Sequence, residues 1–211
     1  VYCSPEHRFG SDALLLARFC EPKRAQKAAD LCSGCGIVSL EWHDRGHRGL
    51  CAAVELQPEA SALLQELWPR RTSSTSPLSH RLRTFREGEG QFDVCACNPP
   101  YLPPGRRAPT QAVPRPVTDG LHPRGCLRLW FPPAEGRRKA SLCHRPERLA
   151  EVLAVLRAHR LEPKRLAFVK NSLTPRRGFF LVEAQKNRRT GLRIEPDVLI
   201  TAGAAMYGEV K

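Results

Sequence analysis

The sequence predicts a three-layer α/β fold in which helices cover both faces of a mostly parallel sheet. A short apolar run, 28–31, leads into the glycine-rich turn 32–36 and then into a second apolar run that starts at Ile37. This is the strand–turn–helix order of a nucleotide-binding unit. Another apolar run, 49–54, reads as a second buried strand and ends at Glu55. In such sheets the ligand lies beyond the carboxyl ends of the strands.

Turn residues and apolar spacing place the remaining elements. Ser11 or Asp12 can cap a helix that runs to about Cys20. Pro58 begins an amphipathic packing helix. Pro146 stands in the first turn of another helix, whose leucines and valines follow the i, i+3, i+4, i+7 spacing of one buried face. The other expected elements are a helix at 37–43 and strands at 28–31, 49–54, 92–97, around 142–143, at 166–169 and at 179–184.

The glycine turn is the first part of a candidate ligand site. Gly34 and Gly36 let the backbone turn tightly and allow a ligand close to the start of the next helix. Glu55 lies roughly twenty residues further on, at a strand end, where an acid can accept hydrogen bonds from both hydroxyls of a ribose. The chain lacks a full G-x-G-x-x-G motif. Asp30, at the end of the first strand, favours a ligand with a charged amine over a pyrophosphate.

The second part of the site is Asn98-Pro99-Pro100-Tyr101, directly after the apolar run 92–97. The amide oxygen of Asn98 and the carbonyl of Pro99 can each accept one N–H of an exocyclic amine. Proline lacks a backbone N–H and holds φ at about −65°, so the turn is fixed. Tyr101 offers a face for stacking, which contributes about 1–3 kcal/mol for a nucleobase. The alternative is a strand that ends in a Pro-Pro turn with a surface tyrosine.

These motifs, in this order, resemble those of class I S-adenosylmethionine-dependent methyltransferases that modify exocyclic amines, and more narrowly the bacterial tRNA(Val) adenine-N(6) methyltransferases. Asn-Pro-Pro-Tyr is shared with DNA adenine methyltransferases and with enzymes that methylate a protein glutamine. The motif therefore indicates the chemistry better than the substrate. The blocks 8–17 and 144–149 favour the tRNA enzyme. The matching blocks are 8–17, 30–40, 54–59, 92–104, 144–149, 164–166 and 181–184.

The resemblance implies a Rossmann-like class I methyltransferase fold over a single domain, 1–211, with S-adenosyl-L-methionine as cofactor. The implied reaction is methylation of N(6) of an adenine next to the anticodon of valine tRNA. Asn98, Pro99 and Tyr101 would be the catalytic residues. Asn98 and the Pro99 carbonyl would polarise the amine, and Tyr101 would hold the extruded base. Alignment of the amine with the methyl group would be the main catalytic device.

The resemblance also implies where the cofactor is bound. Two of its candidate residues, Phe9 and Ser11, are placed near the methionine moiety by the resemblance alone. For Ser11 and its neighbour Asp12, a helix-capping role is the competing interpretation. The expected cofactor-binding residues are Asp30, Gly34, Gly36, Glu55, Phe9 and Ser11.

Two segments depart from the pattern of the family. Between Pro69 and Arg81 the fold requires a third strand and an acid for the cofactor's adenine, but His80 or Arg81 stands where family members carry Asp. The segment 103–133 is rich in Pro, Gly and Arg and has no helical period. A disturbed reading frame would produce this pattern, and Val1 as the first residue indicates an N-terminally truncated fragment. Two alternatives follow: a protein-glutamine N(5)-methyltransferase acting on a translation factor, and an inactive RNA-binding or vestigial member of the fold.

Composition indicates the partner and the compartment. The chain has 34 Lys and Arg against 21 Asp and Glu, a formal charge of +13, which favours a polyanion such as tRNA, although a basic surface can also serve solubility alone. Nine cysteines, an odd number, include Cys32-x-x-Cys35 and Cys95-x-Cys97. These pairs lie in the glycine turn and in a buried strand, where free Cys packs as a small apolar residue, so we expect no metal. No apolar run approaches the roughly 20 residues that span a membrane. We expect a monomeric protein of the reducing cytoplasm.

Overall fold

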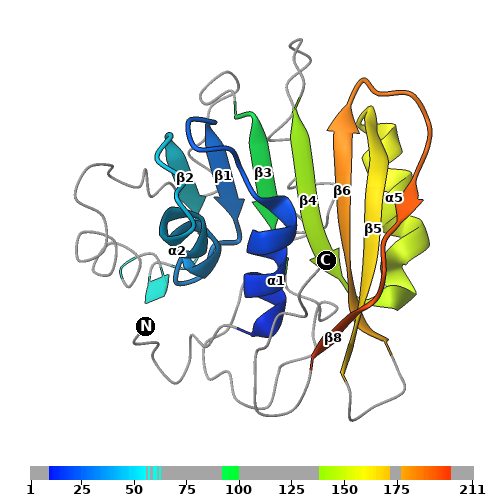
Figure 1. Cartoon of the computed structure of the whole chain (residues 1–211), viewed down its shortest axis with the longest axis horizontal. Helices are drawn as coiled ribbons and strands as arrows, with labels where there is room; N and C mark the ends of the chain where they lie inside the picture. Colours follow the sequence, from blue (N-terminus) through cyan, green and yellow to red (C-terminus); the bar gives the residue numbers. More distant parts are fainter. Residues whose placement is uncertain are drawn as a thin grey trace.

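A computed structural model of the protein forms one mixed sheet with α1 and α2 on one face and α5 on the other (Figure 1). The structure describes residues 10–55, 57, 59–60, 62, 92–99, 138–171 and 177–200. In chain order the described elements are α1 (Ser11–Cys20), β1 (Ala28–Leu31), α2 (Ile37–Asp44), β2 (Cys51–Val54), β3 (Val94–Cys97), β4 (Lys139–His144), the 3-10 helix η2 (Pro146–Arg148), α5 (Leu149–Ala158), β5 (Leu161–Asn171), β6 (Arg177–Lys186), β7 (Arg193–Ile194) and β8 (Val198–Ile200).

The sheet order is β2-β1-β3-β4-β6-β5-β7, and β8 also pairs with β5. The strands β2, β1, β3 and β4 are mutually parallel, whereas β6 is antiparallel to both of its neighbours. Leu31 pairs with Val54 on one side and with Cys97 on the other, and Cys97 pairs with Leu142. The residues after these positions therefore lie level with one another at the carboxyl edge of the sheet.

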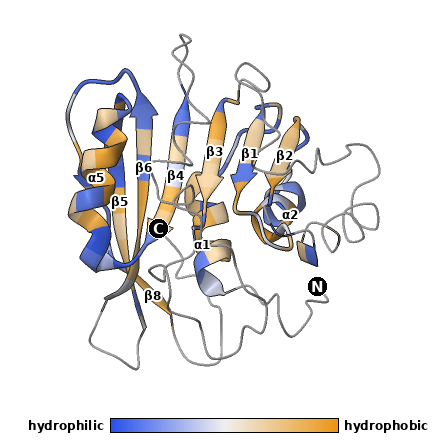
Figure 2. Ribbon diagram, turned by 180° about the vertical axis from the view of Figure 1, so that it is seen from behind, coloured by the Kyte–Doolittle hydropathy of each residue, from blue (hydrophilic) through white to orange (hydrophobic). Residues whose placement is uncertain are grey.

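Two hydrophobic clusters hold the layers together. One joins the sheet to α5 through residues such as Leu31, Leu156 and Phe180. The other joins it to α1 and α2 and contains Leu16 and Trp42. Figure 2 shows apolar residues predominating along β3 and recurring along α5. Because side chains alternate across a strand, every second residue of β1 faces the α1–α2 layer.

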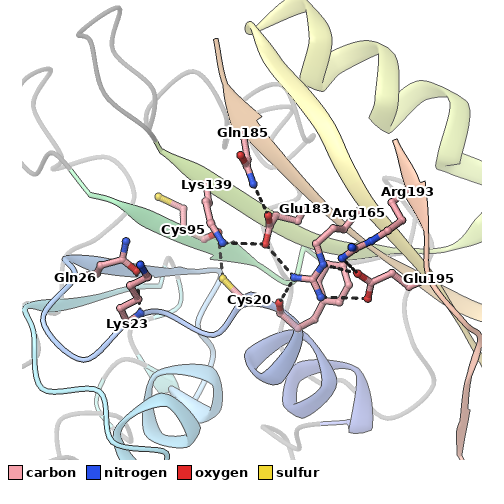
Figure 3. Close-up of polar contacts among 11 residues, drawn as sticks. Cys20, Lys23, Gln26, Cys95, Lys139, Arg165, Glu183, Gln185, Arg193 and Glu195 are labelled. Atoms are coloured by element: carbon pink, nitrogen blue, oxygen red, sulfur yellow. Dashed lines mark hydrogen bonds and ion pairs between the residues drawn. The ribbon is translucent and has the colours of Figure 1, made fainter. Parts of the chain in front are cut away.

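A charged network fastens the amino-terminal part of β4 and the late strands to the end of α1 (Figure 3). Glu183 is 1% exposed, and its carboxylate lies 3.5 Å from Lys139 Nζ and 3.2 Å from an Arg165 guanidinium nitrogen. The Arg165 guanidinium also binds Glu195 at 2.6 Å and lies 4.4 Å from the Phe19 ring centroid. Arg165 holds the pKa of Glu195 below its usual value, mainly through this hydrogen bond. Because Lys139 and Arg165 both pair with it, the buried Glu183 carboxylate does not carry the cost of an unpaired charge.

The structure confirms most of the predicted elements. The predicted strands are all present, and β5 and β6 are longer than expected. The predicted helix after Pro146 begins as η2 and continues as α5, which buries Val152, Val155 and Leu156. The short strands β7 and β8 were not predicted: β7 has two residues, both exposed, and β8 has only three.

The predicted capping of α1 by Ser11 or Asp12 is wrong. The helix spans Ser11–Cys20 as expected, but its N-cap is Gly10, and no side chain makes the capping hydrogen bond. Asp12 lies in the first helical turn, where the helix dipole favours a carboxylate. This carboxylate accepts a hydrogen bond from the side chain of Asn98, directly after β3. The predicted helix from Pro58 is described only at 59–60 and 62, where the chain is helical. The segments 69–81 and 103–133 lie outside the described residues.

The seven cysteines in the described part of the chain are free thiols. Burial raises the pKa of Cys20 and of Cys51 to about 12, so both remain neutral and pack as small apolar groups. Within the described ranges, no group of His, Cys, Asp and Glu is arranged to hold a metal ion. None of the described helices has the length and apolar character to cross a membrane.

Candidate functional site

The glycine turn between β1 and α2 presents open backbone at the carboxyl edge. Cys32, Gly34 and Gly36 have φ of 54°, 56° and 80°, the left-handed region that glycine adopts most easily. The Ser33 N–H donates to the Val54 carbonyl at 3.1 Å, which fixes the turn against β2. A Cβ built on Gly34 would meet nothing within 4 Å. A ligand can therefore approach the turn at Gly34.

Glu55 ties this turn to the end of β2. One carboxylate oxygen accepts the Gly34 N–H at 2.7 Å, and the other accepts the Gln57 N–H at 2.9 Å. Each oxygen of an ionised carboxylate can accept a further hydrogen bond. The structure thus brings Glu55 to the glycine turn, and its predicted contact with ribose hydroxyls stays a prediction.

Asp30 lies behind the turn, on the face of the sheet that α1 and α2 cover. Its side chain is 1% exposed, and Oδ2 accepts the Ser39 backbone N–H at 3.2 Å and the Ser39 hydroxyl at 3.0 Å. Within the described residues, Oδ1 has no hydrogen-bond partner. Burial raises the Asp30 pKa to about 7, against the opposing effect of the Ser39 hydrogen bonds. Either a proton on the carboxyl group or a donor from a ligand would satisfy the second oxygen.

This raised pKa predicts a pH-dependent stability. Between pH 3.8 and about 7 the folded protein keeps a proton on Asp30 that the unfolded chain loses. The free energy of unfolding therefore falls as pH rises through this interval. Asp30→Asn keeps an acceptor for Ser39 and removes the titration. We expect the stability of the variant relative to the parent protein, measured by thermal unfolding, to rise as pH rises through this interval. Identical slopes for the two proteins would show that Asp30 does not titrate in this range.

Asn98 follows β3 directly and is held on three sides. Its backbone N–H donates to the Leu31 carbonyl at 3.4 Å. Its side-chain Nδ2 donates to Asp12 Oδ2 at 3.2 Å, and its Oδ1 accepts the Cys143 thiol at 3.0 Å. Pro99, next in the chain, is buried. The amide is thus fixed between the first turn of α1 and strand β4.

The other predicted site residues are only partly placed. Ser11 opens α1 beside Asp12 and is half-buried, near the same edge of the sheet. Phe9 and Tyr101 lie outside the described residues. Sequence reasoning missed the contacts of Asn98 with Asp12 and Cys143. Asp12 lies in one of the blocks that carry the resemblance, but Cys143 gave no signal beyond its apolar strand.

The arrangement supplies two acceptors flanking an open turn. Strand β1 lies between β2 and β3, so the turn after β1 separates Glu55 from Asn98. Adjacent strands are about 4.8 Å apart, and Glu55 and Asn98 therefore follow strands that are roughly 10 Å apart. One ligand with a ribose near Glu55 and a second ligand with an amine at Asn98 would meet over the turn. This geometry suits transfer of a group from the first ligand to the second.

Two solved structures with the same fold are described as methyltransferases. A predicted O-methyltransferase, Atu636 from Agrobacterium tumefaciens, superimposes with a TM-score of 0.70 at 20% identity, over 94% of this chain and 92% of that one. A putative class I S-adenosylmethionine-dependent methyltransferase from Listeria monocytogenes gives a TM-score of 0.60 at 12% identity, over 98% and 69% of the two chains. The fold is that of class I methyltransferases, as the sequence predicted.

The sequence relatives are more specific. Over 105 residues the chain is 31% identical to the tRNA1(Val) (adenine(37)-N6)-methyltransferase of Haemophilus influenzae, and over 106 residues it is 28% identical to that of Shewanella sp. strain MR-7. These alignments cover 46% and 48% of this chain and 44% of each relative. The chain therefore matches less than half the length of these relatives. A release factor glutamine methyltransferase of Streptomyces coelicolor is 35% identical over 78 residues, 35% of this chain and 26% of that protein. No protein-family model matches the chain.

Proposed function

We propose that the protein transfers the methyl group of S-adenosyl-L-methionine to the exocyclic N(6) amine of an adenine in tRNA. The observation that carries this proposal is the placement of Glu55, the open turn at Gly34 and the fixed amide of Asn98 along one edge of a class I methyltransferase sheet. The likeness over 105 residues to a tRNA1(Val) (adenine(37)-N6)-methyltransferase supports the choice of adenine.

The residues present fit this cofactor. The space over Gly34 admits a ligand close to the backbone, and Glu55 has acceptor capacity left for ribose hydroxyls. The unpartnered Asp30 Oδ1 behind the turn is compatible with a proton or a donor. When bound, S-adenosylmethionine supplies an electrophilic methyl group. Phe9 and Ser11 remain the proposed neighbours of its methionine moiety.

Asn98 is the proposed amine-binding residue. Its Oδ1 accepts one hydrogen bond from Cys143, and a carbonyl oxygen has two lone pairs, so it can accept an N–H of the adenine amine as well. The Pro99 carbonyl is proposed to accept the second N–H. Held in this way, the amine directs its nitrogen lone pair toward the methyl donor. Because an amide and a carbonyl act here as acceptors rather than as bases, alignment contributes most of the acceleration.

Valine tRNA, at the adenine next to the anticodon, is the substrate that we propose within this class. A formal charge of +13 suits a polyanion, and a base in a single-stranded loop costs least to extrude. Tyr101 is proposed to stack on the extruded base. A monomer acting in the cytoplasm is the accompanying expectation.

A glutamine side chain is the second candidate substrate, because its amide offers the same pair of N–H groups. The 78-residue likeness to a release factor glutamine methyltransferase favours it. An inactive member of the fold is the third possibility and predicts no binding of the cofactor.

Incubation with methyl-labelled cofactor, total tRNA and a protein extract separates these candidates. We expect the label in tRNA, with binding that weakens as salt rises, since phosphate counterions are released on binding. Label in protein glutamine would replace the proposed substrate with the second candidate. Calorimetry that shows no cofactor binding would contradict both enzymatic functions.

A further inference from the structure

We propose that Asp12 and Cys143 are positioning residues that fix which end of the Asn98 amide faces the substrate amine. This inference rests on the proposed function, because it concerns the group that we assign to amine binding. Asp12 Oδ2 lies 3.2 Å from Asn98 Nδ2, and Cys143 Sγ lies 3.0 Å from Asn98 Oδ1. The two partners come from α1, which covers one face of the sheet, and from β4, the strand beside β3.

The Asp12 carboxylate selects one orientation of the amide, and the Cys143 thiol is compatible with that orientation. An ionised carboxylate accepts hydrogen bonds and cannot donate, whereas a thiol can donate its proton. Asn98 therefore turns its NH₂ group to Asp12 and its oxygen to Cys143. The reversed amide would set its oxygen against the Asp12 carboxylate and would present N–H groups where the substrate amine also has N–H groups. The observed orientation leaves an acceptor for that amine.

Gly10 supplies independent support for this role of Asp12. The φ of Gly10 is −95°, which any residue can adopt, so the backbone does not require glycine there. A Cβ on Gly10 would overlap Asp12 Oδ1, so a larger residue would displace the Asp12 carboxylate from its observed position. Glycine at position 10 thus leaves room for the Asp12 carboxylate in the position from which it reaches Asn98.

Four variants test the proposal in the full chain. Asp12→Asn keeps an acceptor atom but adds an NH₂ donor, so it no longer excludes the reversed Asn98 amide, and it should lower kcat for tRNA by about tenfold or more. Gly10→Ala removes no polar group and should lower kcat in the same direction by displacing Asp12. Cys143→Ala should lower kcat, and Cys143→Ser should restore most of it, because a hydroxyl donates to the same oxygen. The dissociation constant of the cofactor should change by less than about twofold in all four.

Two matched control variants lie toward the amino ends of the strands. Asp93→Asn changes a carboxylate that accepts the Lys27 N–H at 2.9 Å, and Cys20→Ala removes a buried thiol that lies 3.8 Å from the Cys95 carbonyl. Neither should change kcat. In an Asn98→Ala background, Asp12→Asn should lower the rate no further, because Asp12 acts through Asn98. A wild-type kcat for Asp12→Asn, or an equal loss in the Asn98→Ala background, would overturn the proposal.

A spectroscopic measurement separates this proposal from the proposed function. In the nitrogen-15 spectrum, the Asn98 side-chain amide should show protons protected from exchange, and Asp12→Asn and Gly10→Ala should weaken that protection, whereas Asp93→Asn should not. If the parent protein transfers no methyl group but the protection follows this pattern, the proposed function fails and the positioning stands. If all variants keep the protection, the positioning fails, whatever the activity.

Discussion

Asn98→Ala is expected to lower the rate of methyl transfer by a hundredfold or more and to leave the affinity for S-adenosylmethionine nearly unchanged. The variant removes the amide that α1 and β4 hold in place beside the open turn. Loss of one preorganised polar group at a reacting centre costs about 2.7–4 kcal/mol of transition-state stabilisation. The proposed ribose contact at Glu55 lies on the other side of the turn and is untouched, so the effect should fall on kcat. Single-turnover rates and calorimetric titration measure the two quantities separately.

Gln26→Ala is a suitable control for this variant. The Gln26 side chain is also an amide with a hydrogen bond, which it accepts from the Lys23 N–H at 2.8 Å, but it precedes β1 and so lies toward the opposite edge of the sheet. The Gln26→Ala variant should transfer the methyl group at the rate of the parent protein. Near-normal transfer by Asn98→Ala would show that Asn98 does not hold the amine. A marked fall in thermal stability would instead indicate that the side chain mainly supports the fold.

Glu55→Ala should have the opposite signature, a large loss of cofactor affinity. The carboxylate accepts the N–H groups of Gly34 and Gln57 at 2.7 and 2.9 Å, so its removal loosens the turn as well as deleting the proposed ribose contact. Hydrogen bonds to a charged group contribute about 1.5–3 kcal/mol each, so the dissociation constant of the cofactor should rise at least about tenfold. At saturating cofactor the rate of transfer should recover most of its parent value.

Glu21→Ala controls for the loss of a carboxylate at a distance from the turn. Glu21 follows α1 and makes an exposed ion pair with Arg45 at 2.8 Å, of the kind that contributes little to stability. The affinity of the Glu21→Ala variant for the cofactor should equal that of the parent protein. Unchanged affinity in Glu55→Ala would remove Glu55 from the cofactor site. A rate that stays low at saturating cofactor would point to a role in the chemical step.

The sequence predicted the fold well where its signals are local. Strands β1, β2 and β3 are fully buried runs that end at recognisable turns. The glycine turn marks the connection between β1 and α2. The strands β7 and β8 contain only two and three residues, and both pair with β5. The hydrophobic pattern of a short segment does not predict which distant strand it pairs with.

The site was predicted less completely, because its contacts join distant parts of the chain. Asp12 and Asn98 are 86 positions apart, and Cys143 follows Asn98 by 45. Helix propensity favours Asp near a helix start as a cap, and the sheet geometry overrides that preference here. Alternation along β1, in contrast, does explain why Asp30 faces the α1–α2 layer and binds Ser39, behind the turn.

Identification of the methylated nucleoside tests the account most directly. Total tRNA is incubated with the protein and S-adenosylmethionine and digested to nucleosides, and the products of the parent protein are compared with those of Asn98→Ala by mass spectrometry. The account predicts N(6)-methyladenosine with the parent protein and little or none with the variant. A methyl group on another nucleoside, or on another atom of adenosine, would contradict the amine-binding role given to Asn98.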